Sequence, residues 1–189
     1  MPRHLSHSVG FDDAPFAPGH RGDVPVVGAV FSGLRLEGVL SGRVRRDGAN
    51  ATRVLAELVG RSRFAAHIQV VLLQGIAMAG FNVIDLHALH RLLQRPVLAI
   101  ARRQPDLAAI QRALHGRIPG GRRKWALIER LGPMEAVAGL FVQRAGLTRE
   151  ESEALIRGLA VNSALPEPLR TAHLIAAGIT LGQSSRHRA

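Results

Sequence analysis

Two neighbouring carboxylates, Asp12 and Asp13, follow a short apolar segment at residues 8–11. Successive side chains of an extended chain point to opposite faces, so only one of the two can face a given site. A carboxylate at the end of a strand suits Mg²⁺ or Mn²⁺, because these ions prefer oxygen ligands and bring phosphates with them. The alternative is turn chemistry, since aspartate commonly begins a turn before proline.

Asp47 and His173 are weaker candidates when judged by residue type alone. Asp47 precedes Gly48 at the end of a predicted strand, where a plain turn or a helix cap is the simpler interpretation. His173 lies in an apolar stretch, where a histidine more often packs than binds a ligand. The chain has no cysteine, which excludes a disulfide scaffold, a zinc–thiolate site and a cysteine nucleophile.

Basic residues concentrate in the middle of the chain. Only one of the 25 Lys and Arg residues is a lysine, and ten of the 25 lie within residues 90–131, which hold just two acidic residues. Arginine binds phosphates with a planar fork, so the pattern indicates a nucleic-acid partner, DNA or RNA. The alternative is a solvated arginine-rich face. Residues 119–124 lack the order of a phosphate-binding loop and are expected to form a flexible basic turn. The candidate phosphate contacts are Arg102, Arg103, Arg122, Arg123 and Lys124.

Apolar periodicity predicts an alternation of strands and helices around these residues. Residues 24–31 form a nearly continuous valine-rich run, which is typical of a strand inside a sheet. Strands are predicted at 8–11, 24–31, 34–45 with an interruption near 37–38, 68–73, 96–101 and 136–142. Helices are predicted at 51–62, 82–94, 106–115, 122–131, 148–159 and 166–181.

This order of elements predicts the α/β class, with helices on both faces of a mixed sheet. Three strands joined by turns form an antiparallel meander at one edge, and a βαβ unit places parallel strands at the other. The first strand is then central, and the strand after the first helix lies beside it. Asp12 and Gln74 therefore end neighbouring strands at the carboxyl edge, where ligands of α/β sheets usually bind.

Length and composition fit one compact domain, residues 1–189, with disordered tails at 1–7 and 184–189. Apolar residues make up 47% of the chain and charged residues 21%, which excludes wholesale disorder. No apolar run approaches the roughly 20 residues of a membrane span, and the N-terminal segment lacks the apolar core of a signal peptide. We therefore expect a soluble, cytoplasmic protein without membrane contact. The sequence carries no signal for its oligomeric state.

Six segments together resemble the UPF0215 family, also called domain of unknown function 99. They are GFDDAPF (10–16), VVGAVFSG (26–33), RRDGANAT (45–52), LLQGIAMAGFNVIDL (72–86), RPVLAIARRQPD (95–106) and PEPLRTAHLIA (166–176). The resemblance runs from about residue 8 to about residue 180. That family is similar to endonuclease V, so the resemblance implies a ribonuclease-H-like fold.

The resemblance to endonuclease V also implies a set of site residues. Asp12 matches the principal metal ligand of that enzyme, and Asp47 stands where it has a glutamate. Gln74 falls at the position of a second strand-end acid, so a neutral amide replaces a carboxylate. His173 matches the histidine of the final helix, and Arg102 falls near a lysine that follows the fifth strand.

Two functions from different classes follow from this set. The first is a phosphodiesterase that cleaves nucleic acid with Mg²⁺ or Mn²⁺. Asp12, Asp47 and Gln74 would hold the metal, His173 would orient or protonate the leaving oxygen, and Arg102 would neutralise the phosphate. The second is a catalytically inactive nucleic-acid-binding protein that keeps the nuclease fold. The neutral amide favours the second function. So does the absence of tyrosine from the chain, because the chain then lacks the aromatic wedge by which endonuclease V, in this resemblance, opens duplex DNA.

Overall fold

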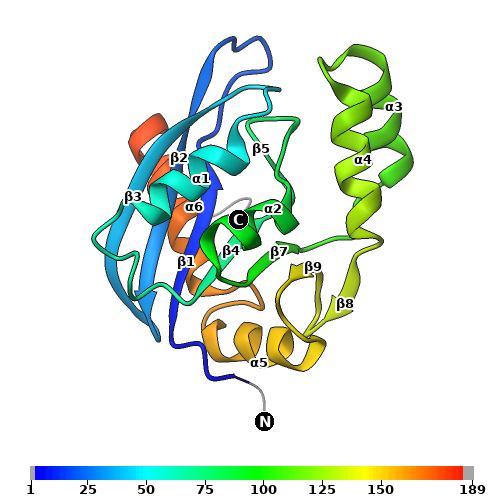
Figure 1. The fold of residues 1–189 in the computed structure, drawn as a ribbon. Coiled ribbons are helices and arrows are strands. Elements are labelled where there is room, and N and C mark those ends of the chain that lie inside the picture. The colour runs from blue at the N-terminus through cyan, green and yellow to red at the C-terminus, as the bar shows by residue number, and fades with distance from the viewer. Residues whose placement is uncertain (1–2, 185–189) are drawn as a thin grey trace.

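A computed structural model describes residues 3–184 of the chain. Figure 1 shows a central sheet with α1 (Ala51–Gly60) and α2 (Leu86–Leu93) on one face and α6 (Glu167–Leu181) on the other. Helices therefore cover both faces of the sheet, as the sequence predicts. Of the expected tails, residues 1–2 and 185–189 lie outside the described residues.

The remaining helices are α3 (Leu107–Arg117), α4 (Gly121–Leu131) and α5 (Arg149–Leu159). The strands are β1 (His7–Asp13), β2 (Asp23–Ser32), β3 (Arg35–Arg45), β4 (Val70–Gln74), β5 (Ala77–Met78), β6 (Asn82–Val83), β7 (Val97–Ala101), β8 (Glu135–Val137) and β9 (Leu140–Ala145).

Within the described chain, seven strands form the main sheet in the order β3-β2-β1-β4-β7-β9-β8. β1 pairs antiparallel with β2 and parallel with β4, and β4 pairs parallel with β7. The mixed sheet and the adjacent β1 and β4 confirm the prediction. The far edge differs from it, because β9 runs antiparallel to β7 and carries β8 on its outer side. The parallel strands therefore occupy the middle of the sheet and not its edge.

The strand predictions succeed where the apolar pattern alone decides the structure. β2 lies between β3 and β1 and is buried without interruption from Val26 to Phe31, as a continuous apolar run requires. The interruption predicted near residues 37–38 is a β-bulge. Pairing between β2 and β3 shifts between Val30 and Phe31 and leaves Glu37 as the extra residue.

Two predicted elements are wrong in their extent. The helix predicted at 82–94 begins only at Leu86, because Asn82 belongs to the short hairpin β5–β6 and its side-chain amide donates to the carbonyl oxygen of Arg45. The strand predicted at 136–142 is the hairpin β8–β9. Its chain turns at Ala138 and Gly139, which both have positive φ.

Helices α3 and α4 form a hairpin that lies to one side of the sheet in Figure 1. The hairpin has its own small core, in which Leu114 and Ile128 pack against Val83 of β6. Arg122–Lys124 lie in the first turn of α4, which agrees with the helix predicted at 122–131 and not with the flexible basic turn expected at 119–124. The basic segment is therefore held on a rigid element.

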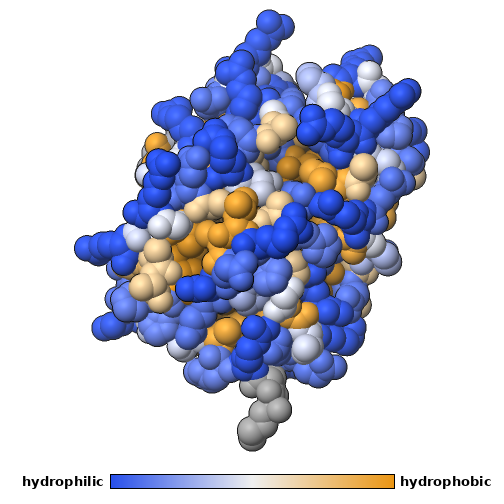
Figure 2. All heavy atoms as spheres, in the orientation of Figure 1, coloured by the Kyte–Doolittle hydropathy of each residue, from blue (hydrophilic) through white to orange (hydrophobic). Residues whose placement is uncertain are grey.

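The surface in Figure 2 is mainly hydrophilic, with an apolar patch in the region of α1 and α2. Leu92 at the end of α2 contributes to the apolar surface of the molecule, with 64% of its area exposed. Within residues 3–184, no helix has both the length and the hydropathy that crossing a bilayer would demand.

The close approach of α6 to β1 depends on a glycine. A Cβ atom at Gly10 would lie 2.5 Å from the carbonyl carbon of Pro168 and 2.6 Å from the backbone nitrogen of Leu169. Both neighbours are backbone atoms, which cannot rotate away as the end of a side chain can. Gly10 therefore lets the start of α6 rest directly on β1.

Replacing Gly10 with alanine should lower the free energy of unfolding by about 1–3 kcal/mol, because the start of α6 must move outward. Gly178→Ala is the matched control, since an added Cβ there has nothing within 4 Å. Because Gly178 lies inside α6, the control should raise stability by about 0.5–1 kcal/mol. Urea unfolding measures both changes. Equal stability of Gly10→Ala and the parent protein would contradict the tight contact.

Candidate active site

The carboxyl ends of four strands meet at one edge of the sheet. β1, β4 and β7 run parallel to one another. β3 runs in the same direction as β1, because both strands are antiparallel to β2, which lies between them. Asp12 and Asp13 end β1, Gln74 ends β4, and Asp47 follows β3 two residues after its end. The edge predicted for Asp12 and Gln74 is confirmed, and Asp47 lies at the same end of the sheet.

Asp12 is paired with His173 across this edge. The Asp12 carboxylate and the His173 ring are 9% and 19% exposed, and Nδ1 of the ring lies 2.8 Å from Oδ2 of the carboxylate. The other carboxylate oxygen accepts a hydrogen bond from the backbone N–H of Asp13 at 3.0 Å. The pair forms because α6 is seated on β1 at Gly10, two residues before Asp12. It leaves the Nε2 atom of His173 available for a further partner.

Gln74 lies beside Asp12 on the neighbouring strand. Phe11 pairs in register with Leu73, and Asp12 and Gln74 are the next residues of the two parallel strands. Equivalent positions on adjacent strands share a face, about 4.8 Å apart. The Oε1 atom of Gln74 is buried and has no hydrogen-bond partner among the described residues. An unpartnered oxygen therefore lies close to the Asp12–His173 pair.

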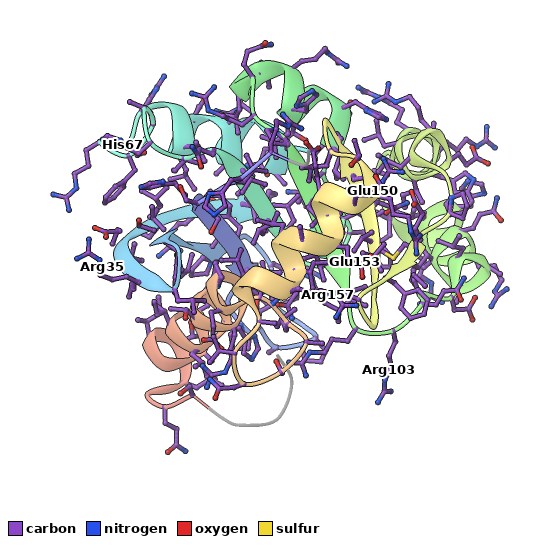
Figure 3. The ribbon with its side chains drawn as sticks, turned by 90° about the horizontal axis from the view of Figure 1, so that it is seen from below. Arg35, His67, Arg103, Glu150, Glu153 and Arg157 are labelled. Atoms are coloured by element: carbon purple, nitrogen blue, oxygen red, sulfur yellow. The ribbon has the colours of Figure 1, made fainter. Side chains whose placement is uncertain are left out.

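A cavity of about 540 Å³ opens next to Gln74. Gly75, Arg102, Arg103 and Leu165 contribute to its lining. Both arginines are exposed, and Figure 3 shows the Arg103 side chain extending outward from the ribbon. Two predicted phosphate-binding residues thus lie at the mouth of a cavity whose wall includes a predicted metal ligand.

Asp13 faces the other side of the sheet, where it meets the β5–β6 turn. Its Oδ2 atom accepts a hydrogen bond from the backbone N–H of Ala79 at 3.1 Å. The pKa of Asp13 is raised from its ordinary value of 3.8 to about 6, first by burial and then by the adjacent Asp12 carboxylate. Asp13 was not among the predicted site residues. The Asp12–Asp13 doublet was its only signal in the sequence.

Asp47 contacts the same β5–β6 turn. Its backbone N–H donates to the carbonyl oxygen of Ala79 at 2.9 Å, and its Oδ1 atom accepts from the backbone N–H of Phe81 at 2.8 Å. Its other carboxylate oxygen lies 3.3 Å from Nε of Arg46. The described contacts therefore connect Asp47 with Asp13 through Ala79 and show no direct bond to Asp12.

Lys124 does not lie on the exposed basic face that the sequence predicts. Its side chain is buried, with 4% of the residue exposed, and its Nζ atom donates to the backbone carbonyl of Asp47 at 2.6 Å. Burial lowers the pKa of Lys124, and the nearby Asp47 charge partly opposes that change. Arg122 and Arg123 are exposed, as expected. The basic face therefore contains these arginines without the lysine.

Residues 3–184 contain no group of three His, Cys, Asp or Glu side chains placed to hold a metal ion together. Asp85, another acid near the edge in sequence, is occupied elsewhere. It caps α2 through the backbone N–H of Ala88 and pairs with Arg130 at 2.7 Å. Any cation at this edge would therefore need neutral oxygen ligands such as Gln74 in addition to the carboxylates of Asp12 and Asp47.

Comparisons with known proteins agree with this geometry. A family model described as Endonuclease dU matches residues 4–180. The chain belongs to the Endonuclease dU family. A UPF0215 protein of Deinococcus radiodurans is 58% identical over 184 residues, which cover 97% of this chain and 94% of the relative. This confirms the resemblance to UPF0215 seen in the sequence.

Solved structures place this Endonuclease dU family member in a wider fold group. A protein of unknown function from Archaeoglobus fulgidus is similar with a TM-score of 0.85 and 32% identity, over 92% of this chain and 97% of that chain. Endonuclease V of Ciona intestinalis, in complex with a 24mer DNA containing an inosine, is similar with a TM-score of 0.55 and 13% identity. That match covers 88% of this chain and 82% of the other. The ribonuclease-H-like fold is confirmed.

The raised pKa of Asp13 predicts a pH dependence of stability. The folded state holds this proton more tightly than the unfolded state, so the stabilisation by protonated Asp13 is lost as the pH rises from about 4 through about 6. A rise from 3.8 to about 6 corresponds to at most about 3 kcal/mol. Asp13→Asn keeps an acceptor for Ala79 and removes the charge, so it should stabilise the protein at pH 7.5 more than at pH 4.5.

Urea unfolding at the two pH values measures this difference between Asp13→Asn and the parent protein. Asp13→Ala is the comparison variant, because it removes both the charge and the acceptor for the Ala79 N–H. It should show the same pH trend with lower stability throughout. A stability difference between Asp13→Asn and the parent that is the same at both pH values would contradict the buried, charge-coupled environment of Asp13.

Proposed function

We propose that this protein is a divalent-metal-dependent endonuclease that cleaves DNA at deoxyuridine. The observation that carries the proposal is the Asp12–His173 pair at the carboxyl edge, next to the unpartnered oxygen of Gln74. The proposed substrate is supported by the description of the family, Endonuclease dU, and by the inosine-containing DNA bound by a protein of the same fold. Uracil and hypoxanthine are both products of base deamination, so the two substrates share one chemistry.

The residues at the edge fit Mg²⁺ or Mn²⁺. The carboxylate of Asp12 and the orphaned Oε1 atom of Gln74 are oxygen donors on adjacent strands, and the Gln74 atom has no other partner among the described residues. Asp47 adds a second carboxylate at the same edge of the sheet. A bound divalent ion supplies Lewis-acid stabilisation of the phosphate and activates water at neutral pH.

The protein's own groups account for orientation and charge. Asp12 accepts from Nδ1 of His173 and so fixes the direction in which Nε2 points. With the ring oriented in this way, Nε2 can hold the proton destined for the leaving oxygen. Arg102 and Arg103 at the cavity mouth neutralise the phosphate, and Arg122 and Arg123 add contacts to the DNA backbone.

The test is cleavage of an oligonucleotide that contains a single deoxyuridine, with Mn²⁺ or Mg²⁺ present. Asp12→Asn should reduce the cleavage rate at least about a hundredfold, because it removes the charge of the principal ligand and weakens the His173 contact. Asp23→Asn is the matched control. Asp23 begins β2 at the same end of the sheet and is 49% exposed in a 3.7 Å ion pair with Arg45.

The parent and the control should cut the oligonucleotide at its deoxyuridine. They should leave intact an otherwise identical oligonucleotide that has thymidine at that position. Equal cleavage by Asp12→Asn and the parent protein would refute the assignment of Asp12. Cleavage that does not distinguish deoxyuridine from thymidine would refute the proposed substrate and leave the hydrolysis of phosphodiesters standing.

A second candidate is a nucleic-acid-binding protein that has lost the chemistry. The neutral side chain of Gln74 and the absence of a three-ligand cluster within residues 3–184 favour it. The two candidates differ in how strongly the edge binds a cation. If the protein is a nuclease, the parent should bind Mn²⁺ at this edge, although weakly. If it is only a nucleic-acid-binding protein, no binding of Mn²⁺ at the edge is expected.

Gln74→Asp should increase the rise in melting temperature that Mn²⁺ produces, because the variant adds a charged oxygen beside Asp12. Without metal the same variant should melt at a lower temperature than the parent, since the new carboxylate repels Asp12 and Asp13. Thermal melts with and without Mn²⁺ separate the two effects. If Mn²⁺ stabilises Gln74→Asp no more than the parent, the edge is not a metal site and the binding protein is the better description.

A further inference from the structure

The single lysine of the chain occupies an unusual place on α4. The residues of α4 that are buried are Gly121, Lys124 and Ile128, at the spacing of one helix face. Arg122 and Arg123, in the same turn, are exposed. An ammonium group on the inward face is costly unless it is paired, so Lys124 needs a structural reason to be there.

That reason is its bond to Asp47. The Nζ atom donates to the Asp47 carbonyl at 2.6 Å. This hydrogen bond connects the α3–α4 hairpin directly to a predicted site residue. Asp47 has φ of 51°, a left-handed conformation that is unfavourable for a residue with a side chain. Bonds from neighbouring elements must therefore hold this conformation in place.

Three groups of Asp47 are held at once. Lys124 binds its carbonyl, Ala79 accepts from its N–H, and the Phe81 N–H donates to its carboxylate. Gly80, between the last two, has no room for a side chain, since a Cβ there would lie 2.5 Å from the Asp47 carboxylate. The position of the carboxylate is thus set by its neighbours on both sides.

The same contacts extend to β1. Ala79 accepts from Asp47 through its carbonyl oxygen and donates through its N–H to the Asp13 carboxylate at 3.1 Å. Three consecutive hydrogen bonds therefore connect Lys124 on α4 to the residue next to Asp12. The hairpin that carries Arg122 and Arg123 outward is tied to the candidate active site on its inner side.

We propose that Lys124 is a positioning residue, which fixes the Asp47 carboxylate and couples the basic α3–α4 hairpin to the carboxyl edge. Its importance for cleavage rests on the proposed function, whereas its hold on Asp47 does not. A lysine suits the position because its compact ammonium fits a buried space at the end of a flexible stem, while the broad arginine fork favours exposed phosphate contacts.

Amide hydrogen exchange tests the hold on Asp47 without any assay of activity. Lys124→Met keeps the apolar stem and removes the ammonium. The amides of Asp47 and Phe81 should then exchange about tenfold faster, because their bonds open more often. The amide of Gly75 is bonded to Ile100 at the same edge and should be unchanged.

Two controls separate positioning from general loosening. Trp125, the only tryptophan, packs in the core of the hairpin, so unchanged emission shows that the hairpin in Lys124→Met is still seated. Arg123→Met removes the neighbouring exposed cation and should leave the exchange of both amides unchanged. The proposal is overturned if Lys124→Met does not speed the exchange at Asp47 and Phe81. It is also overturned if the exchange of the Gly75 amide accelerates as much as that of Asp47 and Phe81 and the Trp125 emission changes as well. The same holds if Arg123→Met speeds the exchange at Asp47 and Phe81.

Kinetics on the deoxyuridine oligonucleotide test the link to cleavage. Lys124→Met should lower kcat about tenfold with little change in KM, because it disturbs the site and not the exposed DNA contacts. Arg123→Met should raise KM instead. A parent protein that cleaves nothing defeats the proposed function and leaves the exchange result to decide the role of Lys124. Accelerated exchange with an unchanged kcat overturns the coupling to catalysis.

Discussion

The hydrogen bond between His173 and Asp12 joins residues 161 positions apart and connects the last helix to the end of β1. It can form only if α6 approaches the backbone of β1 closely, and Gly10 leaves room for that approach. Because both side chains are largely shielded from water, loss of one partner would leave the other desolvated without compensation. The same seating of α6 brings Leu165 against the cavity beside Gln74. The site and the packing of the final helix are therefore one structural feature.

The electrostatics of the edge run against those of the whole protein. The formal net charge is +11, yet acidic side chains gather at the ends of β1 and β3. Asp12 and Asp13 are held by an imidazole ring and by backbone N–H groups, which fix the oxygens without a full neutralising charge. The positive field of the protein attracts a phosphate over long range, but the edge repels it at close range. In the proposed function, a divalent cation held by Asp12 would offset this repulsion.

The sequence predicted the fold where one pattern dominated and failed where tertiary contacts decided. The valine-rich run of β2 and the parallel β1 and β4 follow from hydrophobicity and element order. The start of α2 does not, because Asn82 continues a helical pattern but its amide is bonded across space to the carbonyl of Arg45. Asp12 was predicted from its position at the end of a strand and His173 from the resemblance to endonuclease V, and the two are found together. The prediction that Lys124 is exposed was wrong, because nothing in a run of basic residues marks the one that the folded chain buries.

The residue at position 74 decides between two electrostatic states of the edge. A carboxylate there would stand next to Asp12 and would raise the pKa of Asp13 further, so the edge would need a cation to be stable. The amide of Gln74 removes that need, and the backbone pairing of β4 with β7 is the same for either side chain. The neutral amide lowers the affinity of the edge for a cation and leaves the fold unchanged. A change of one formal charge at this position can therefore alter the affinity for a cation on an unchanged scaffold, which is why fold similarity alone does not choose between the two proposed functions.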